Sequence, residues 1–386
     1  DVDGTCLEVP MPTGEEEEGC RMAKNLCQGA YKCIEKHGLV FAYMGPPEEE
    51  PPFPEWEGDF TCHEDDKLVP FSNVQTCNWL QVQDNAADQF HHTPLHTTAL
   101  IPGHEQGTTF GEAGANAYLV RPDLQFFPVQ DGKSMAWTSS RRVDDDYLFI
   151  RINHQILPNL SFHSYLFEDG KKSKHFSRVH MYRWTVPIDN TTCKMIGWRG
   201  IGPHIDPRDV GNEDLIGFEK IDFLEGQCGM RRPERATFGP GQLPPVPKHH
   251  RHRSAYVDAQ HAPGDYEITA SQRSIAVHAL ESPMKFDGGV YLSRKQLRDA
   301  ISGDNEKASP EAWKEWLEEV DGKPNTYCSG NVLAIPKGAT PEEEIERRRD
   351  VAKRCIAAIT ESDNLPNVER YAFVKQKMSE IEQDYA

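Results

Sequence analysis

The sequence predicts a mixed α+β fold built on an antiparallel sheet, and three features of the chain lead to this prediction. Apolar and polar residues alternate in several runs between Tyr147 and Gly200, and these runs are rich in β-branched and aromatic side chains. Three segments near the C-terminus repeat apolar residues at helical spacing, and a proline-rich stretch sets a short first segment apart from the rest. Runs of strands followed by runs of helices are typical of the α+β class.

Residues 1–44 predict short β structure, which ends in an apolar run that starts at Gly38. The next stretch, residues 45–56, holds five prolines and four glutamates, so it suits neither a helix nor a strand. We therefore expect two domains, one over residues 1–46 and a larger one over residues 47–386.

The part of the chain after Tyr147 predicts an antiparallel meander. The last two of its runs flank a polar tetrapeptide that begins at Asp189, which is typical of a turn between paired strands. Short connections of this kind join antiparallel neighbours. The four alternating runs are residues 147–156, 160–167, 180–188 and 193–200.

The last third of the chain predicts helices. Residues 265–280 are helix-compatible and follow a stretch rich in proline, glycine and histidine. Helical patterns then occupy residues 310–320, 341–359 and 369–385. In the last of these, five apolar or aromatic residues recur at helical spacing and predict a buried face: Tyr371, Val374, Met378, Ile381 and Tyr385.

Composition excludes several classes of protein. Among 386 residues, 61 acidic and 42 basic side chains leave a net charge of -19, which repels nucleic acid and anionic membrane surfaces. No apolar run approaches the roughly 18 residues of a transmembrane helix. The ten cysteines include no Cys-x-x-Cys pair, so their spacing favours packed, reduced thiols over a zinc ribbon or an iron–sulfur cluster. We expect a cytoplasmic protein without a nucleic-acid or membrane partner.

The densest group of chemically active side chains is Asn85, Asp88, His91, His92 and His96. A helical pattern precedes Pro94, and on a helix Asp88 and His91 would share one face, because they are three residues apart. His91 and His96 are five residues apart and would point about 140° away from each other on an ideal helix, but a bend at Pro94 would let them converge.

Two imidazoles and one carboxylate form the facial triad of non-haem Fe(II) oxygenases, which leaves positions open for dioxygen and substrate. A zinc hydrolase uses similar ligands. Structural histidines without a metal are the third reading of this cluster, and a metal site needs a further carboxylate from elsewhere in the chain. His92 is expected at the surface or behind the site, because it points away from the face that His91 uses.

Asn85 to His91, with His96 after four more residues, resembles the iron motif of Rieske non-haem iron ring-hydroxylating oxygenases, α subunit. In that family the third ligand is an aspartate seven residues before a glutamine, and Asp265 and Gln272 match this pattern. Three further segments resemble the phthalate dioxygenase and O-demethylase branch of the family: residues 38–45, 78–81 and 184–189.

The resemblance implies a helix-grip (START-like) catalytic domain, in which a curved antiparallel sheet surrounds a long helix. It also implies a mononuclear Fe(II) held by His91, His96 and Asp265, which activates O2 to hydroxylate or O-demethylate an aromatic substrate, most simply an aromatic acid. Asp88 resembles the carboxylate that links the iron site to the cluster of a neighbouring subunit in a homotrimer. Electrons would come from a reductase or ferredoxin through a [2Fe–2S] Rieske cluster.

The sequence also departs from the family. The cluster is normally held by a Cys-x-His pair and a Cys-x-x-His pair, and neither occurs here. We therefore expect residues 1–46 to be the C-terminal remnant of a Rieske domain and residues 47–386 to be the catalytic domain. Ala270 stands where relatives often have an acidic residue. The alternatives are a redox-inactive helix-grip module that binds a ligand, and a zinc-dependent hydrolase at the same site.

Other histidines and arginines give weaker signals. Residues 249–253 place contiguous histidines next to arginines in a proline-rich loop and predict a solvated patch. Arg183, Arg199 and Arg273 are candidates to meet a substrate carboxylate, and the sequence does not choose among them.

Overall fold

The computed structural model describes residues 4–56, 67–95, 121–164, 173–177, 179, 181–201 and 265–386. His96 and the run 249–253 lie outside these residues. The chain divides into two compact units, Asp1–Pro51 and Pro52–Ala386.

In the first unit, the described residues form one α-helix, one hairpin and a short 3-10 helix at Pro47–Glu49. β1 (Cys33–Lys36) pairs antiparallel with β2 (Leu39–Ala42) through a two-residue turn, in which His37 and Gly38 both have positive φ. The expectation of β structure throughout residues 1–44 was wrong, because α1 (Glu16–Ala23) is a helix. Three glutamates occupy its first turn, where they interact favourably with the positive end of the helix dipole.

In the second unit, the described residues form a nine-stranded antiparallel sheet. Its strands are β3 (Lys67–Gln75), β4 (Asp123–Val129), β5 (Ser134–Arg142), β6 (Tyr147–Ile156), β7 (Leu160–His163), β8 (Lys174–Ser177), β9 (Met181–Asp189), β10 (Thr192–Ile201) and β11 (Ser329–Ala334). The main order is β3-β10-β9-β7-β6-β11-β8, while β5 pairs with β6 and β4 pairs with β5. The predicted α+β class and the antiparallel meander are confirmed, and the turn at Asp189 joins β9 to β10.

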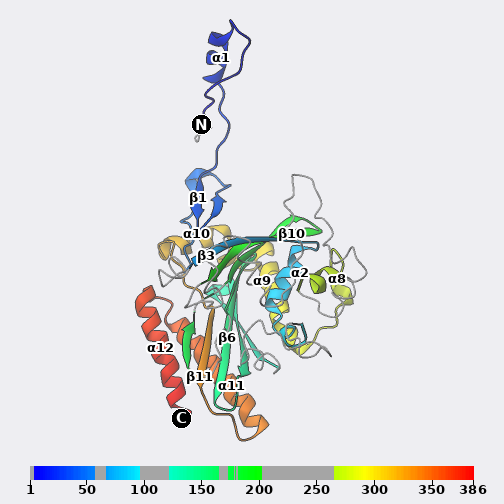
Figure 1. The fold of residues 1–386 in the computed structure, drawn as a ribbon, viewed down its shortest axis with the longest axis vertical. Coiled ribbons are helices and arrows are strands. Elements are labelled where there is room, and N and C mark those ends of the chain that lie inside the picture. Colours follow the sequence, from blue (N-terminus) through cyan, green and yellow to red (C-terminus); the bar gives the residue numbers. More distant parts are fainter. Residues whose placement is uncertain are drawn as a thin grey trace. The chain divides into compact units, whose positions relative to one another are not determined.

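Helices cover both faces of this sheet (Figure 1). α11 (Pro341–Glu361) and α12 (Asn367–Gln383) pack on one face, and α2 (Trp79–Ala87), α8 (Asp265–Ser271) and α9 (Gly288–Ser302) lie on the other side. α10 (Pro310–Glu319) confirms the first of the predicted C-terminal helices. The long helix implied by the resemblance is a pair, since α11 and α12 both contribute to one core with β5, β6 and β11.

Strand alternation explains why the two faces have different partners. On β5, Ala136 packs into the core with α11, whereas its neighbours Met135 and Trp137 pack against Ala87 at the end of α2. Successive residues of a strand point to opposite faces, so β5 contributes to both layers. Every residue of β5 is buried.

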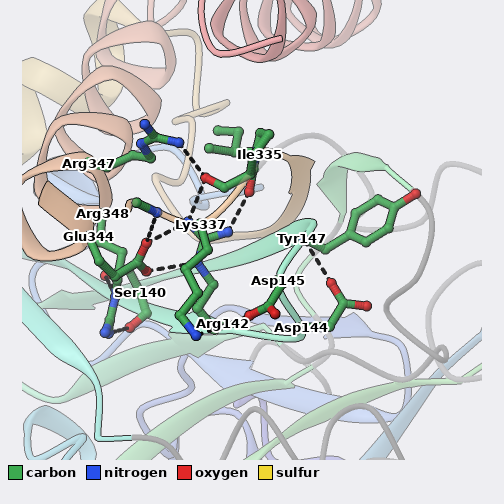
Figure 2. A network of polar contacts seen from close by, with 12 residues as sticks. Ser140, Arg142, Asp144, Asp145, Tyr147, Ile335, Lys337, Glu344, Arg347 and Arg348 are labelled. Carbon is green, nitrogen blue, oxygen red and sulfur yellow. Dashed lines mark hydrogen bonds and ion pairs between the residues drawn. The ribbon is translucent and has the colours of Figure 1, made fainter. Parts of the chain in front are cut away.

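The N-terminus of α11 is fixed to the sheet by the polar network that Figure 2 shows. Thr340 caps the helix by accepting a hydrogen bond from the backbone amide of Glu343. The buried guanidinium of Arg142 on β5 contacts both carboxylate oxygens of Glu344, at 2.7 and 2.8 Å. Arg142 also donates to the carbonyls of Ile335 and Pro336, which follow β11. One side chain thus holds β5, the end of β11 and α11 together.

Candidate metal site

The site begins with α2, which runs from a well-formed cap to an early end. Asn78 caps the helix by accepting from the backbone amide of Leu80, and the buried Val82, Ala86 and Ala87 face the rest of the fold. The expectation that the helix continues toward Pro94 was wrong. α2 ends at Ala87, and Pro94 lies within α3 (His92–Leu95).

The physical reason for the early end is Asp88. Its backbone is extended, with φ -81° and ψ 103°, and its carboxylate accepts a hydrogen bond from the backbone amide of Phe90 at 2.8 Å. Aspartate side chains compete in this way with the helical hydrogen bonds of the backbone. The chain therefore turns before His91 instead of placing Asp88 and His91 on one helix face.

Two carboxylates from different parts of the chain nevertheless meet at His91. Oδ2 of Asp88 lies 3.4 Å from Nδ1 of His91, and Oδ1 of Asp265, the first residue of α8, lies 3.3 Å from Nε2. The amide of Asn85 reaches the same oxygen of Asp265 at 3.4 Å. Three of the four predicted site residues are thus in one place, and the fourth, His96, lies outside the described part of the chain.

The position of α8 is set by contacts with α2 and the segment before it. The hydroxyl of Tyr266 lies 2.9 Å from that of Thr76, and the amide of Gln81 donates to the carbonyls of Thr269 and Arg273. These bonds bring the first residue of α8 next to His91, although the two are distant in sequence.

The carboxylates dominate the electrostatics of this group. Burial disfavours a protonated imidazole, but Asp265 and Asp88 raise the pKa of His91 to about 9. Burial also disfavours an ionised Asp88, yet hydrogen bonds from His91 and from the amide of Phe90 hold the pKa of Asp88 below its usual value. His163 on β7 stays neutral, because burial and the charges of Arg183 and Arg151 lower its pKa well below the usual value.

A cavity of about 380 Å³ is lined by residues of α2, α8 and α9. Asn85, Asp88 and His91 line it together with residues of α9 and of the segment after α8. Arg273 also lines this cavity. Arg183 is buried within β9, so it lies in the sheet rather than on the cavity wall. The side chain of Arg199 lies outside the described residues.

The donor set fits Fe(II) chemically. Imidazole nitrogen and carboxylate oxygen both suit this ion. Neighbouring ligands of an octahedral ion with bonds of about 2.1 Å lie about 3.0 Å apart. The 3.3 Å between Nε2 of His91 and Oδ1 of Asp265 is close to this spacing.

Sequence reasoning missed the polar layer behind His91. His92 is only 8% exposed, so of its two expected positions the one behind the site is confirmed and the one at the surface is wrong, and its ring lies edge-on to that of His91 with 4.5 Å between centroids. Gln89, Arg141 and Arg151 are buried beside it. The signal available in the sequence was the row of polar residues on alternate positions of β6.

Comparison with known proteins gives relatives of one kind. The chain is 35% identical over 383 residues to the tert-butanol monooxygenase / tert-amyl alcohol desaturase oxygenase subunit of Aquincola tertiaricarbonis, covering 99% of this chain and 74% of the relative. It is 27% identical over 323 residues to the phenoxybenzoate dioxygenase subunit alpha of Ectopseudomonas oleovorans, covering 78% of this chain and 63% of the relative.

Among solved structures, NdmA of Pseudomonas putida CBB5 with caffeine is similar with a TM-score of 0.41 and 14% identity, over 79% of this chain and 70% of that one. No protein-family model matches the chain. No helix among the described residues is both long and apolar enough to span a membrane.

Proposed function

Because this chain belongs to the oxygenase subunits of the Rieske non-haem iron oxygenases, we propose that His91, His96 and Asp265 hold a mononuclear Fe(II) at which an organic substrate is oxidised with O2. The chain is an oxidoreductase of the Rieske type. We also propose that residues 1–46 are the end of a Rieske domain and residues 47–386 the catalytic domain.

The observation that carries the proposal is the approach of Asp265 to Nε2 of His91. His91 lies in the segment between α2 and α3 and Asp265 is the first residue of α8, and the ring nitrogen and carboxylate oxygen that would bind the ion are 3.3 Å apart. When bound, the iron would supply the site for O2 activation. Asn85 orients Asp265 through its amide, and Asp88 orients the ring of His91 from the opposite nitrogen.

Asp88 is the residue that we assign to electron entry. Its carboxylate contacts Nδ1 of His91 and the backbone amide of Phe90, and one side of it faces the cavity. We propose that this side meets a cluster ligand of a neighbouring subunit in a homotrimer. The sequence has no Cys-x-His or Cys-x-x-His pair of its own, so we propose that the [2Fe–2S] cluster is held by residues of the protein outside this sequence and receives electrons from a reductase or ferredoxin.

We propose an aromatic compound as the substrate, hydroxylated or O-demethylated, and an aromatic acid as its simplest form. The names of relatives support this class, since they include a phenoxybenzoate dioxygenase and a phthalate 4,5-dioxygenase. A small tertiary alcohol is the second candidate, because the relative that aligns with 99% of this chain is named for tert-butanol and tert-amyl alcohol.

Metal analysis after anaerobic reconstitution tests the proposal. We expect about one iron per chain, and loss of iron in His91→Ala, His96→Ala and Asp265→Ala. His278→Ala is the matched control, because His278 is an exposed histidine outside the proposed ligand set. Stoichiometric zinc instead of iron would support the hydrolase, and a chain that binds no metal would support the ligand-binding module; either result overturns the oxygenase.

A further inference from the structure

The four residues between α2 and α3, 88–91, lie outside both helices. They include Asp88 and His91, and the backbone leaves the helical path at Asp88. Gln89 lies between these two residues and is only 1% exposed. A buried amide needs hydrogen-bond partners, so the contacts of Gln89 reveal what fixes this segment.

Two strands of the sheet hold Gln89 through two different atoms. Arg151 on β6 donates from Nη1 to the side-chain oxygen Oε1 at 3.1 Å, and Arg141 on β5 donates from Nη2 to the backbone oxygen at 3.2 Å. The side-chain Nε2 of Gln89 donates back to the carbonyl of Ala86 in the last turn of α2. Gln89 is therefore hydrogen-bonded both to strands β5 and β6 of the sheet and to the last turn of α2.

The two arginines are themselves rigidly placed. Arg141 and Arg151 are 0% and 1% exposed, on paired strands, and Nε of Arg151 also donates to the carbonyl of Ser164 at 2.6 Å. A guanidinium with several fixed acceptors loses little freedom when it binds one more. Gln89 thus meets donors whose positions are set by the sheet and do not depend on α2.

The guanidinium of Arg151 also contacts His92, the residue that follows His91 in the chain. Nη1 of Arg151 lies 3.4 Å from Nδ1 of His92, and because arginine can only donate, Nδ1 of His92 is the acceptor. The ring of His92 in turn lies edge-on to His91. His91 therefore stands between two residues that share one anchor, Gln89 before it and His92 after it.

We propose that Gln89 is a positioning residue of the metal site, which transfers the fixed geometry of β5 and β6 to Asp88 and His91. This inference rests on the proposed function, because it assumes that a metal binds at His91. Outer partners of metal ligands typically change metal affinity by about 10- to 100-fold when they are lost. The Arg151 to Gln89 bond acts one step further from the ion, through the backbone of the segment.

Gln83, on α2, offers a matched control. It is also a buried glutamine, at 2% exposure, yet neither atom of its side-chain amide has a hydrogen-bond partner among the described residues. Replacement of either glutamine by methionine keeps length and volume and removes the polar atoms. A general effect of burying methionine would appear in both variants, whereas loss of positioning would appear only at Gln89.

The experiment titrates the metal-free protein with Co(II) under anaerobic conditions and follows the visible absorption of the bound ion. We expect Gln89→Met to bind Co(II) about 10- to 100-fold more weakly and with an altered spectrum. Gln89→Glu keeps the acceptor that Arg151 needs, so it should restore affinity to within about threefold of the original protein. Gln83→Met should behave like the original protein.

Equal Co(II) affinity and spectra in Gln89→Met and the original protein would overturn the inference, even if the variant melts at a lower temperature. Weakening of Gln89→Glu to the level of Gln89→Met would overturn it as well. If Gln89→Met does not fold, Gln89→Asn takes its place, since the shorter amide withdraws from Arg151 while remaining polar. An original protein that binds no metal would instead refute the proposed function.

Discussion

Arg294 on α9 lines the cavity and forms ion pairs with two further lining residues, Asp84 and Glu281. Its Nε lies 3.1 Å from Oδ1 of Asp84 on α2, and its Nη1 lies 2.8 Å from Oε2 of Glu281. The side chains of Arg294 and Asp84 are only 8% and 15% exposed. Arg294→Met keeps most of the volume but leaves Asp84 as a buried carboxylate without its counter-ion.

The pKa of Asp84 determines how large the effect is and how it varies with pH. Burial raises the pKa of Asp84 to about 6, although the hydrogen bonds and charge of Arg294 act in the opposite direction. In the unfolded chain the pKa is about 3.9, so folding favours the protonated form by about 3 kcal/mol. Stability contributed by this group therefore rises as pH falls through 6 toward 4.

Without Arg294 the pKa of Asp84 should rise further. The gain in stability that accompanies protonation of Asp84 should therefore begin at a higher pH in the variant. We expect Arg294→Met to reduce the free energy of unfolding by about 3 kcal/mol at pH 8, where the unpaired carboxylate is still ionised. At pH 5 the variant should lose much less, because the folded protein carries a neutral acid at position 84.

Urea unfolding at pH 8, 6.5 and 5 measures this difference. Arg294→Met should gain stability on acidification relative to the double variant Arg294→Met with Asp84→Asn, in which no acid remains at this position. The comparison of the two variants cancels all other titrating groups. If their unfolding free energies run parallel across the three pH values, the assignment of the effect to Asp84 is refuted.

Three further predictions address the fold and the site. Burial and the charge of Arg370 lower the pKa of His154 to about 3. The free energy of unfolding should therefore fall by about 2 kcal/mol between pH 7 and 5, because only the unfolded chain takes up the proton. His154→Gln should remove this loss in urea titrations. Ile359→Ala, at a fully buried position of α11, should cost about 3 kcal/mol in urea unfolding, whereas Ile345→Ala, at an exposed position of the same helix, should cost less than about 1 kcal/mol. Asp88→Asn should keep its iron but lose turnover with the full electron-transfer chain, and retained turnover would contradict the bridging role.

Much of the fold could be predicted because burial on one side of an element leaves a periodic pattern. The stripe of Val374, Met378 and Ile381 predicted the inner face of α12, and all three residues are buried in the same core. Short strands such as β8 and β11 left too little pattern to be recognised. α1 was missed because it is only 8 residues long and its glutamates are equally typical of a solvated loop.

The candidate site was predicted through resemblance and only partly through geometry. Spacing suggested that Asp88 and His91 meet on one helix face, but they meet because the helix ends and the chain turns. No local pattern could pair His91 with Asp265, since this contact depends on how α8 packs against α2. Sequence spacing limits contacts within one element, whereas contacts between elements depend on the packing of the whole domain.

The burial of β6 follows the alternation pattern on one face of the strand but not on the other. Its apolar residues Leu148, Ile150 and Ile152 face the core with α11, as alternation predicts. Alternation would place the intervening polar residues in water, but Arg151, Asn153 and Gln155 are buried as well. Buried polar groups are costly unless they are hydrogen-bonded, so a strand with two buried faces, one apolar and one polar, needs a reason for the second. Here the polar face supplies fixed donors, such as those of Arg151, to the segment that carries His91, which a purely apolar face could not do.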